Sequence, residues 1–285
     1  MNIIEILKAV LFGIVEGITE WLPISSTGHM ILVDEFVHLN VSDSFYKMFQ
    51  VVIQLGAIMA VVILFWDKLW PFCMKQADKS SGSGRSKVAW KDGALDMWLK
   101  IIVACIPAAV VGLIFDDKID ELFYHPLPVA LALIIVGVLF IVVETFCGNR
   151  KPVIENISQI TFKAAVIIGV FQLLAAVFPG TSRSGATIIG ALLIGVSRAA
   201  AAEFTFFLAV PVMFGASLLK AVKYIAEGAA MTGGELGILV VGTLVAFIVS
   251  VLVIKFFMSY IKKHDFKIFG WYRIILGIIV MIVLR

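Results

Sequence analysis

The sequence has little charge and few cysteines, and both shortages exclude classes of protein. Only 15% of its 285 residues are charged while 61% are hydrophobic, which excludes an ordinary water-soluble domain. The net charge of +3 is spread over loops, so no basic patch points to nucleic acid as a partner. Cys73, Cys105 and Cys147 lack C-x-x-C spacing, which argues against a disulfide framework or a zinc site. Glu5 and Lys8 interrupt the N-terminal segment, so a removable signal peptide is not expected.

Uncharged apolar runs fill most of the chain. Six of them, with their flanks, reach the length of about 20 residues that a transmembrane helix needs. Lipid offers the backbone no hydrogen-bond partners, so each run is predicted to be a helix. The expected spans are residues 45–66, 98–115, 128–147, 203–223, 236–258 and 267–284. The sequence therefore predicts an all-α integral membrane protein that forms a single membrane domain over residues 1–285.

Positive charge is unevenly distributed among the loops. The loop at 67–97 is rich in lysine and arginine around Ser80–Gly84, which predicts a flexible cytoplasmic loop under the positive-inside rule. The next loop, Asp116–Pro126, is mainly acidic and is expected outside, whereas Lys262 and Lys263 place the last connection inside. This pattern predicts that both termini lie on the outer side.

Two segments, 1–40 and 160–200, contain polar breaks and fail as simple spans. Each is predicted to be a re-entrant pair, in which a helix is followed by a polar break and a short helix. The breaks contain Pro23 with Ser25–His29 and Pro179–Gly185, respectively. The segments also resemble each other, because each proline is preceded at seven residues by a polar residue and followed at two and three residues by hydroxyls. These residues are Glu16, Ser25 and Ser26 in the first segment and Gln172, Thr181 and Ser182 in the second.

Three full spans separate the two broken segments, and an odd number of spans reverses the orientation of the second segment relative to the first. The halves 1–147 and 148–285 are therefore predicted to be inverted-topology repeats. Re-entrant pairs that enter from opposite faces bring their breaks together near the middle of the membrane, where such proteins commonly place a polar site. The alternative is two ordinary kinked spans, since proline and glycine are frequent in membrane helices.

The first break carries groups suited to phosphate chemistry. Glu16 and Glu20 lie four residues apart, so they share one helix face. Carboxylates are costly in lipid, and a metal ion or a basic group nearby is therefore expected. The hydroxyls of Ser25–Thr27 and the imidazole of His29 supply a candidate nucleophile and a proton-transfer group. The alternative is that the carboxylates touch water at the interface and that a hydroxyl serves only as a helix N-cap.

The second break offers the opposite charge. Arg183 lies at the start of a new helix, where free backbone N–H groups and the helix dipole favour anions. Its planar guanidinium suits bidentate phosphate contact, and the hydroxyls of Ser182, Ser184 and Thr187 complete a predicted pyrophosphate cradle. The alternative is that Arg183 only neutralises the buried glutamates.

Four more polar residues interrupt apolar stretches. Gln54 and Glu203 are expected either to orient the site or to form hydrogen bonds between helices. Arg273 and Lys255 are expected to extend to the membrane interface or to pair there.

Several stretches of the sequence resemble a known family. EGITEWLPISSTGHM at 16–30 and PGTSRSGATI at 179–188 are similar to the two signature motifs of the undecaprenyl-pyrophosphate phosphatases, or undecaprenyl-diphosphatases, that confer bacitracin resistance. VVIQLG at 51–56 and EFTFFLAVP at 203–211 extend the likeness, which covers essentially the whole chain. The resemblance implies a membrane enzyme that hydrolyses undecaprenyl diphosphate to undecaprenyl phosphate and inorganic phosphate, recycling the lipid carrier of cell-wall polymers.

The resemblance also implies roles for individual residues. The family's acidic pair falls on Glu16 and Glu20, its serine on Ser26, its histidine on His29 and its arginine on Arg183. The family depends on a divalent cation, so Mg²⁺ or Ca²⁺ is expected on the two glutamates. The expected location is the bacterial plasma membrane, with the site open to the external face.

The nucleophile stays open among Ser26 assisted by His29, His29 itself and a metal-bound water. The remaining polar side chains of the site are expected to bind the substrate. These are Ser25, Thr27, Gln54, Ser182, Ser184 and Thr187, together with Arg183. The expected partners are undecaprenyl diphosphate and membrane lipids, with no nucleic acid, and a homodimer is compatible with the sequence.

Two rival functions share some of these features. Lipid phosphatases with K-x6-R-P, P-S-G-H and S-R-x5-H motifs look superficially similar, but here no histidine follows Ser182 and Arg183 at the required distance. A transporter or flippase for isoprenyl phosphate lipids would also use inverted repeats with broken helices. Phosphate release by the purified protein separates an enzyme from such a carrier.

Overall fold

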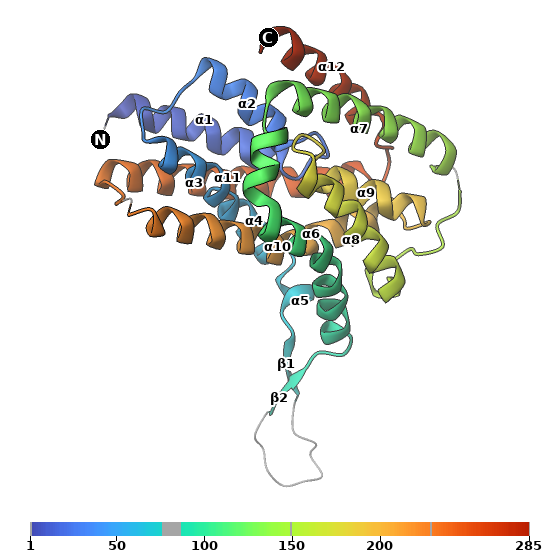
Figure 1. Ribbon diagram of the computed structural model, residues 1–285. Coiled ribbons are helices and arrows are strands. Elements are labelled where there is room, and N and C mark those ends of the chain that lie inside the picture. The colour runs from blue at the N-terminus through green and yellow to red at the C-terminus, as the bar shows by residue number, and fades with distance from the viewer. Residues whose placement is uncertain (1, 76–86, 149, 229, 285) are drawn as a thin grey trace.

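The computed structural model describes residues 2–75, 87–148, 150–228 and 230–284. Helices form nearly all of this part of the chain (Figure 1). The first half contains α1 Ile3–Thr19, α2 Ser26–Phe36, α3 Asp43–Val52, α4 Gln54–Leu64, α5 Trp66–Leu69, α6 Ala94–Phe123 and α7 Pro126–Cys147. The second half contains α8 Phe162–Val177, α9 Arg183–Leu193, α10 Arg198–Ala226, α11 Gly233–Tyr260 and α12 Lys267–Val283. A 3-10 turn, η2 at Ile157–Gln159, and two short strands, β1 Phe72–Lys75 and β2 Lys87–Trp90, complete the elements.

Five helical stretches in the described part are long and apolar enough to cross a membrane. They are Asp43–Leu64, which joins α3 and α4, Ala94–Phe115 of α6, and the helices α7, α10 and α11. The protein is therefore a multi-pass membrane protein. The sixth expected span is also a helix, α12, but its 17 residues rise only about 26 Å, less than the bilayer core of roughly 30 Å.

The segment 67–97, expected to be a flexible loop, contains regular structure at both ends. The helix α5 comes first, and β1 then pairs with β2 in an antiparallel hairpin that places Phe72 opposite Trp90. Figure 1 shows this hairpin extending away from the helical bundle. Ser80–Gly84, on which the expectation of flexibility rested, lies outside the described residues.

The acidic segment Asp116–Pro126 was expected to be a loop, and this was wrong. It consists largely of the last turns of α6, which runs on to Phe123. Two ion pairs hold these turns against α10, one from Lys223 to Asp117 at 3.0 Å and one from Lys220 to Asp120 at 3.2 Å. The helix continues through this acidic stretch because two of its carboxylates find lysine partners on α10.

Glycines allow helices from the two halves of the chain to pack closely. A Cβ atom at Gly56 of α4 would lie 2.0 Å from the backbone oxygen of Thr243 on α11. One at Gly13 of α1 would lie 2.6 Å from the backbone oxygen of Gly242 on the same helix α11. Backbones can approach this closely only where no side chain intervenes, as is common between membrane helices.

Large apolar side chains lie both inside and outside the bundle. Trp21, Phe206 and Phe207 are fully buried in the core, whereas Leu252 and Ile282 remain 65% and 69% exposed. An apolar surface of this kind marks contact with another apolar phase, and for a multi-pass membrane protein that phase is lipid.

Two connections bring the polar residues to the interior. One joins α1 to α2 across residues 20–25, and the other joins α8 to α9 across residues 178–182. They meet near the centre of the molecule (Figure 1), where the Ser184 hydroxyl donates to the backbone oxygen of Glu20 at 3.3 Å.

Candidate active site

Each connection ends in a serine with an uncommon backbone conformation. Ser25 has φ 74° and Ser182 has φ 68°, and no other non-glycine residue in the described part has a positive φ. Each serine is the N-cap of the helix that follows, since Ser25 Oγ accepts from the N–H of Gly28 at 3.4 Å and Ser182 Oγ accepts from that of Gly185 at 3.2 Å. Strain of this kind is concentrated at functional sites.

The two caps correct the residue-by-residue match between the segments. The sequence comparison aligned Ser25 with Thr181 and Ser26 with Ser182, but the structure gives Ser25 and Ser182 the same conformation and the same capping bond. Ser26 therefore corresponds to Arg183. The second connection has one extra residue, and Gly180, with φ 93°, accommodates the turn that this residue requires.

Glu20 joins the two breaks through its carboxylate. Arg183 Nη2 donates to Glu20 Oε1 at 2.9 Å, and the Ser26 hydroxyl donates to Glu20 Oε2 at 2.8 Å. The side chains of Arg183 and Glu20 are only 11% and 9% exposed, so the pair is largely shielded from solvent. One carboxylate thus holds the serine of the first break and the arginine of the second.

The helix α10 completes the surroundings of Arg183. Nη1 donates to the backbone oxygen of Thr205 at 2.9 Å, and Nη2 also contacts the sulfur of Met213 at 3.6 Å. Arg183 Nε is buried without a hydrogen-bond partner among the described residues. The guanidinium is therefore fixed in position through its two Nη atoms, while its buried Nε has no partner in the described part.

A cavity of about 210 Å³ opens beside this cluster. The side chains of both breaks line it together with residues of α4, α6, α8 and α10. The predicted site residues on its wall are Glu20, Ser26, Thr27, Gln54, Ser182 and Arg183. These six come from three separate regions of the sequence, and the fold brings them to one cavity.

Two buried side chains near the cluster have polar atoms without partners. Both amide atoms of Gln172, which lines the cavity, and one carboxylate oxygen of Glu16 are buried and form no hydrogen bond in the described part. Leaving a buried polar group unpaired costs about 1–3 kcal/mol. Such groups call for an explanation, and a polar ligand in the cavity would supply partners for the amide of Gln172.

Four other predicted site residues lie behind the cavity wall. Ser25 is buried as a cap, Glu16 is 1% exposed on α1, and Ser184 bonds to the backbone of Glu20. The Thr187 hydroxyl donates to the backbone oxygen of Arg183 at 2.9 Å. None of the four lines the cavity, and Ser25, Ser184 and Thr187 hold the backbone of the two breaks from behind its wall.

His29 is placed apart from the cavity. Its Nδ1 lies 2.7 Å from the backbone oxygen of Ser25, and its Nε2 lies 2.8 Å from the hydroxyl of Tyr272 on α12. The imidazole also stacks on the Tyr272 ring at 5.6 Å between centroids. Ser25 and Tyr272 thus engage both ring nitrogens, so His29 lies beside the first break but is not part of the cavity wall.

Arg273 was expected at the membrane interface, and this was wrong. It is completely buried and donates to three backbone oxygens, those of Pro23 at 3.3 Å, Gly180 at 2.8 Å and Thr181 at 2.9 Å. The sequence did not reveal this position, because a buried arginine and one at the membrane interface give the same local pattern. Lys255, by contrast, is exposed.

The two alternatives for Gln54 and Glu203 have different outcomes. Gln54 lines the cavity, whereas Glu203 accepts a hydrogen bond from Lys68 Nζ at 2.6 Å and ties α10 to α5. Glu203 therefore acts between helices.

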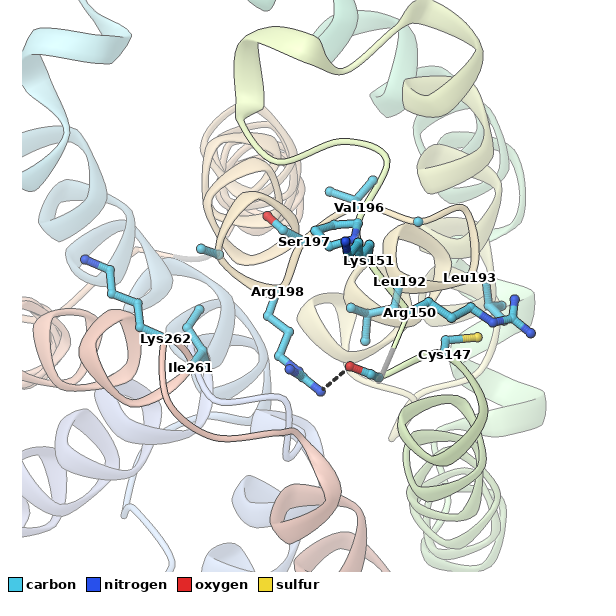
Figure 2. A pocket seen from close by; sticks show the side chains of 14 residues that line it. Cys147, Arg150, Lys151, Leu192, Leu193, Val196, Ser197, Arg198, Ile261 and Lys262 are labelled. Atoms are coloured by element: carbon cyan, nitrogen blue, oxygen red, sulfur yellow. Dashed lines mark hydrogen bonds between the residues drawn. The ribbon is translucent and has the colours of Figure 1, made fainter.

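A second cavity, of about 400 Å³, lies elsewhere in the fold (Figure 2). Arg150, Lys151, Arg198 and Lys262 lie around it. Arg198 is already paired with the buried carboxylate of Glu144 at 2.5 Å. None of the predicted site residues lines this cavity, so it is distinct from the one beside Glu20.

Comparisons with known proteins identify the family. The sequence model described as "Bacitracin resistance protein BacA" matches residues 9–279. The chain is 61% identical over 282 residues to the protein named "Undecaprenyl-diphosphatase" from Desulfitobacterium hafniense, covering 99% of this chain and 97% of the relative. It is 60% identical to "Undecaprenyl-diphosphatase 1" from Clostridium acetobutylicum, covering 99% of this chain and 98% of that relative. It is 57% identical to "Undecaprenyl-diphosphatase" from Enterococcus faecalis, with coverage of 99% and 98%. With a match across nearly its whole length, and the residues of both signature motifs gathered around Glu20, the chain belongs to the BacA family of bacitracin resistance proteins.

Proposed function

We propose that this protein is an undecaprenyl-diphosphatase, which hydrolyses undecaprenyl diphosphate to undecaprenyl phosphate and inorganic phosphate. The observation that carries the proposal is the contact of Ser26 and Arg183 with the single carboxylate of Glu20 beside a cavity. A hydroxyl can serve as the nucleophile of phosphoryl transfer, a carboxylate as its base, and a guanidinium can stabilise the charge on the transferred group.

The diphosphate binds at the second break. Arg183 and Ser182 line the cavity, and α9 begins at Arg183, so the N-terminal end of this helix adds a partial positive charge near the cavity wall. Guanidinium groups bind phosphate strongly because their donors match its oxygens in pairs. The unpaired amide of Gln172 and the hydroxyls of Thr27 and Ser182 on the cavity wall provide further contacts.

Ser26 is the proposed nucleophile and Glu20 the base. The Ser26 oxygen attacks the terminal phosphorus, its proton passes to Glu20 Oε2 along the 2.8 Å hydrogen bond, and the bond to the bridging oxygen breaks. Undecaprenyl phosphate leaves, and water then cleaves the serine phosphate to release inorganic phosphate. Arg183 stabilises the charge that builds up on the transferred group.

His29 has a supporting position in this scheme. Because its ring nitrogens contact Ser25 and Tyr272, it holds the backbone just before Ser26 instead of taking the serine proton. Direct attack by water on the diphosphate is the remaining alternative to Ser26, and the two routes differ in whether a phosphorylated serine forms.

Glu16 and Glu20 are the proposed ligands of a divalent cation, Mg²⁺ or Ca²⁺. The described part contains no group of three or more His, Cys, Asp or Glu side chains that could hold a metal ion, so oxygens of the substrate would have to complete the coordination. Mg²⁺ is commonly held by one or two carboxylates plus substrate phosphates, and the unpartnered oxygen of Glu16 fits that arrangement. When bound, the ion would neutralise part of the diphosphate charge.

The two broken segments also suggest how the chain is arranged in the membrane. We infer that α1–α2 and α8–α9 are re-entrant pairs and that residues 1–147 and 148–285 are inverted repeats. The matching serine caps support this, as does the packing of α1 and α4 of the first half on α11 of the second. The distribution of lysine and arginine favours an external opening, and the bacterial relatives favour the plasma membrane.

Phosphate release by the purified protein in detergent tests the function. We expect release from undecaprenyl diphosphate, and loss of release after chelation of divalent ions that is restored by added Mg²⁺ or Ca²⁺. A protein that only carries the lipid across the membrane would release no phosphate under any of these conditions. Full activity in chelator would contradict the proposed cation.

A further inference from the structure

Arg273 is a buried cation whose hydrogen bonds all end on the two breaks. Its side chain is fully buried, and its three acceptors are the carbonyls of Pro23, Gly180 and Thr181. No carboxylate in the described part of the chain forms an ion pair with it. Its neighbour Tyr272 bonds to His29, so α12 contacts the first break at two points.

The packing of α12 keeps Arg273 at this depth. A Cβ atom at Gly270 would lie 2.7 Å from the backbone oxygen of Gly137, and one at Gly277 would lie 2.8 Å from that of Ala130, both on α7. These glycines precede and follow Arg273 on the same helix face. Because α12 is held against α7 on both sides of Arg273, the guanidinium stays buried beside the two breaks.

A purely space-filling role does not account for this residue. An arginine without an acidic partner is expensive in a membrane interior, and a leucine or methionine would fill the volume without that cost. What an apolar side chain cannot do is bond three carbonyls from two distant segments at once. The planar guanidinium can, because its donors point in fixed, different directions.

The three carbonyls stand just before the strained serine caps. Thr181 precedes Ser182 directly, and Pro23 lies two residues before Ser25. A peptide group is planar, so drawing the Thr181 carbonyl toward Arg273 turns the N–H of Ser182 the opposite way. Arg273 thereby sets the orientation of the peptides that lead into Ser26 in one break and Arg183 in the other.

We propose that Arg273 is a positioning residue for the diphosphatase reaction, one guanidinium that fixes both breaks so that Ser26 and Arg183 keep their separation. This inference rests on the proposed function. It assigns Arg273 no contact with the diphosphate, and so it predicts an effect on the rate of the chemical step and little effect on substrate binding.

The test compares the wild-type protein with Arg273→Lys and Arg273→Met. For each, kcat and KM for phosphate release from undecaprenyl diphosphate are measured per folded molecule, and hydrogen–deuterium exchange is followed in peptides covering 23–28 and 180–185. We expect Arg273→Met to lower kcat about 100-fold with KM changed less than about threefold, and to speed exchange in both breaks. Arg273→Lys should recover about tenfold in kcat, because an ammonium retains the charge but bonds fewer of the carbonyls at once.

Arg198→Met is the matched control. It also removes an arginine that holds helices together, through Glu144, but at a distance from the first cavity. We expect it to lower thermal stability while kcat and exchange in the two breaks stay as in the wild type. If Arg273→Met fails to fold, kcat, KM and hydrogen–deuterium exchange are measured on Arg273→Lys and Arg273→Gln instead.

Two results would overturn the proposal. One is a kcat per folded molecule of Arg273→Met within about threefold of the wild type, and the other is unchanged exchange in both breaks. If the wild-type protein released no phosphate, the proposed function would be wrong. The exchange measurements would still show whether Arg273 orders the two breaks.

Discussion

Glu20 and Arg183 are 163 residues apart in the chain, yet their side chains meet at 2.9 Å in the folded protein. The carboxylate lies at the C-terminal end of α1 and the guanidinium at the start of α9. Each would lose its ion-pair partner at a largely buried position without the other. Their contact defines one end of the cavity and places Ser26 within hydrogen-bond distance of the same carboxylate.

Replacement of Arg183 should slow the reaction strongly even where the substitute keeps the positive charge. We expect Arg183→Ala to lower kcat/KM for undecaprenyl diphosphate about 1,000-fold or more. Arg183→Lys should lower it about 100-fold, because lysine keeps the positive charge but cannot form the paired hydrogen bonds of a guanidinium. Steady-state phosphate release checks both. Lys68→Gln is the control, since the Lys68–Glu203 pair lies outside the cavity and its loss should leave kcat/KM within about threefold.

Ser26 should become phosphorylated during turnover if it is the nucleophile. We expect Ser26→Ala to lower kcat at least about 100-fold, whereas Thr27→Val, on the same cavity wall, should mainly raise KM. Rapid acid quench of the wild-type protein followed by mass spectrometry of the peptide containing Ser26 would detect the adduct. A protein that turns over rapidly without any serine phosphate would assign the attack to water.

His29 should matter less than Glu20. Its ring bonds Ser25 and Tyr272, so His29→Gln removes a support of the backbone and leaves the base in place. We expect a decrease in kcat of about tenfold, with a similar or smaller decrease for Tyr272→Phe, against at least about 100-fold for Glu20→Gln. Comparison of the three variants under one set of conditions decides the point. If His29→Gln lowered kcat as much as Glu20→Gln, the histidine would take part in proton transfer.

Gly56 should be indispensable for the packing of α4 on α11. A methyl group there would meet the backbone of Thr243 at 2.0 Å, and backbone cannot move aside as a side chain can. We expect Gly56→Ala to lower the free energy of unfolding by about 2–3 kcal/mol. Thermal denaturation in detergent measures the effect.

Gly112→Ala provides the comparison for Gly56→Ala. Gly112 lies within α6, and a Cβ atom there would have no atom within 4 Å. Alanine is the better helix former, so this variant should be neutral or more stable by up to about 1 kcal/mol. Equal destabilisation by both substitutions would mean that the close approach of α4 and α11 is not what Gly56 provides.

Much of the architecture could be predicted from local sequence. The apolar runs indicated the spans because a backbone in lipid must satisfy its own hydrogen bonds, and the breaks were visible because Pro23 and Pro179 stand among hydroxyls. The details that failed depend on partners elsewhere in the chain. The acidic end of α6 stays helical beside α10, and the match between the breaks shifted by one residue because Gly180 turns the second connection.

By itself the sequence determined that the protein crosses a membrane several times, and it singled out Glu20, Ser26 and Arg183 as candidates for its chemistry, because such groups are too costly in lipid to lie there without a role. Only the tertiary structure decided which groups face one another. It turned His29 toward Tyr272 and buried Arg273 against both breaks. The direction in which a side chain points and its burial depend on how helices from the two halves pack, and no local pattern in the sequence encodes that packing.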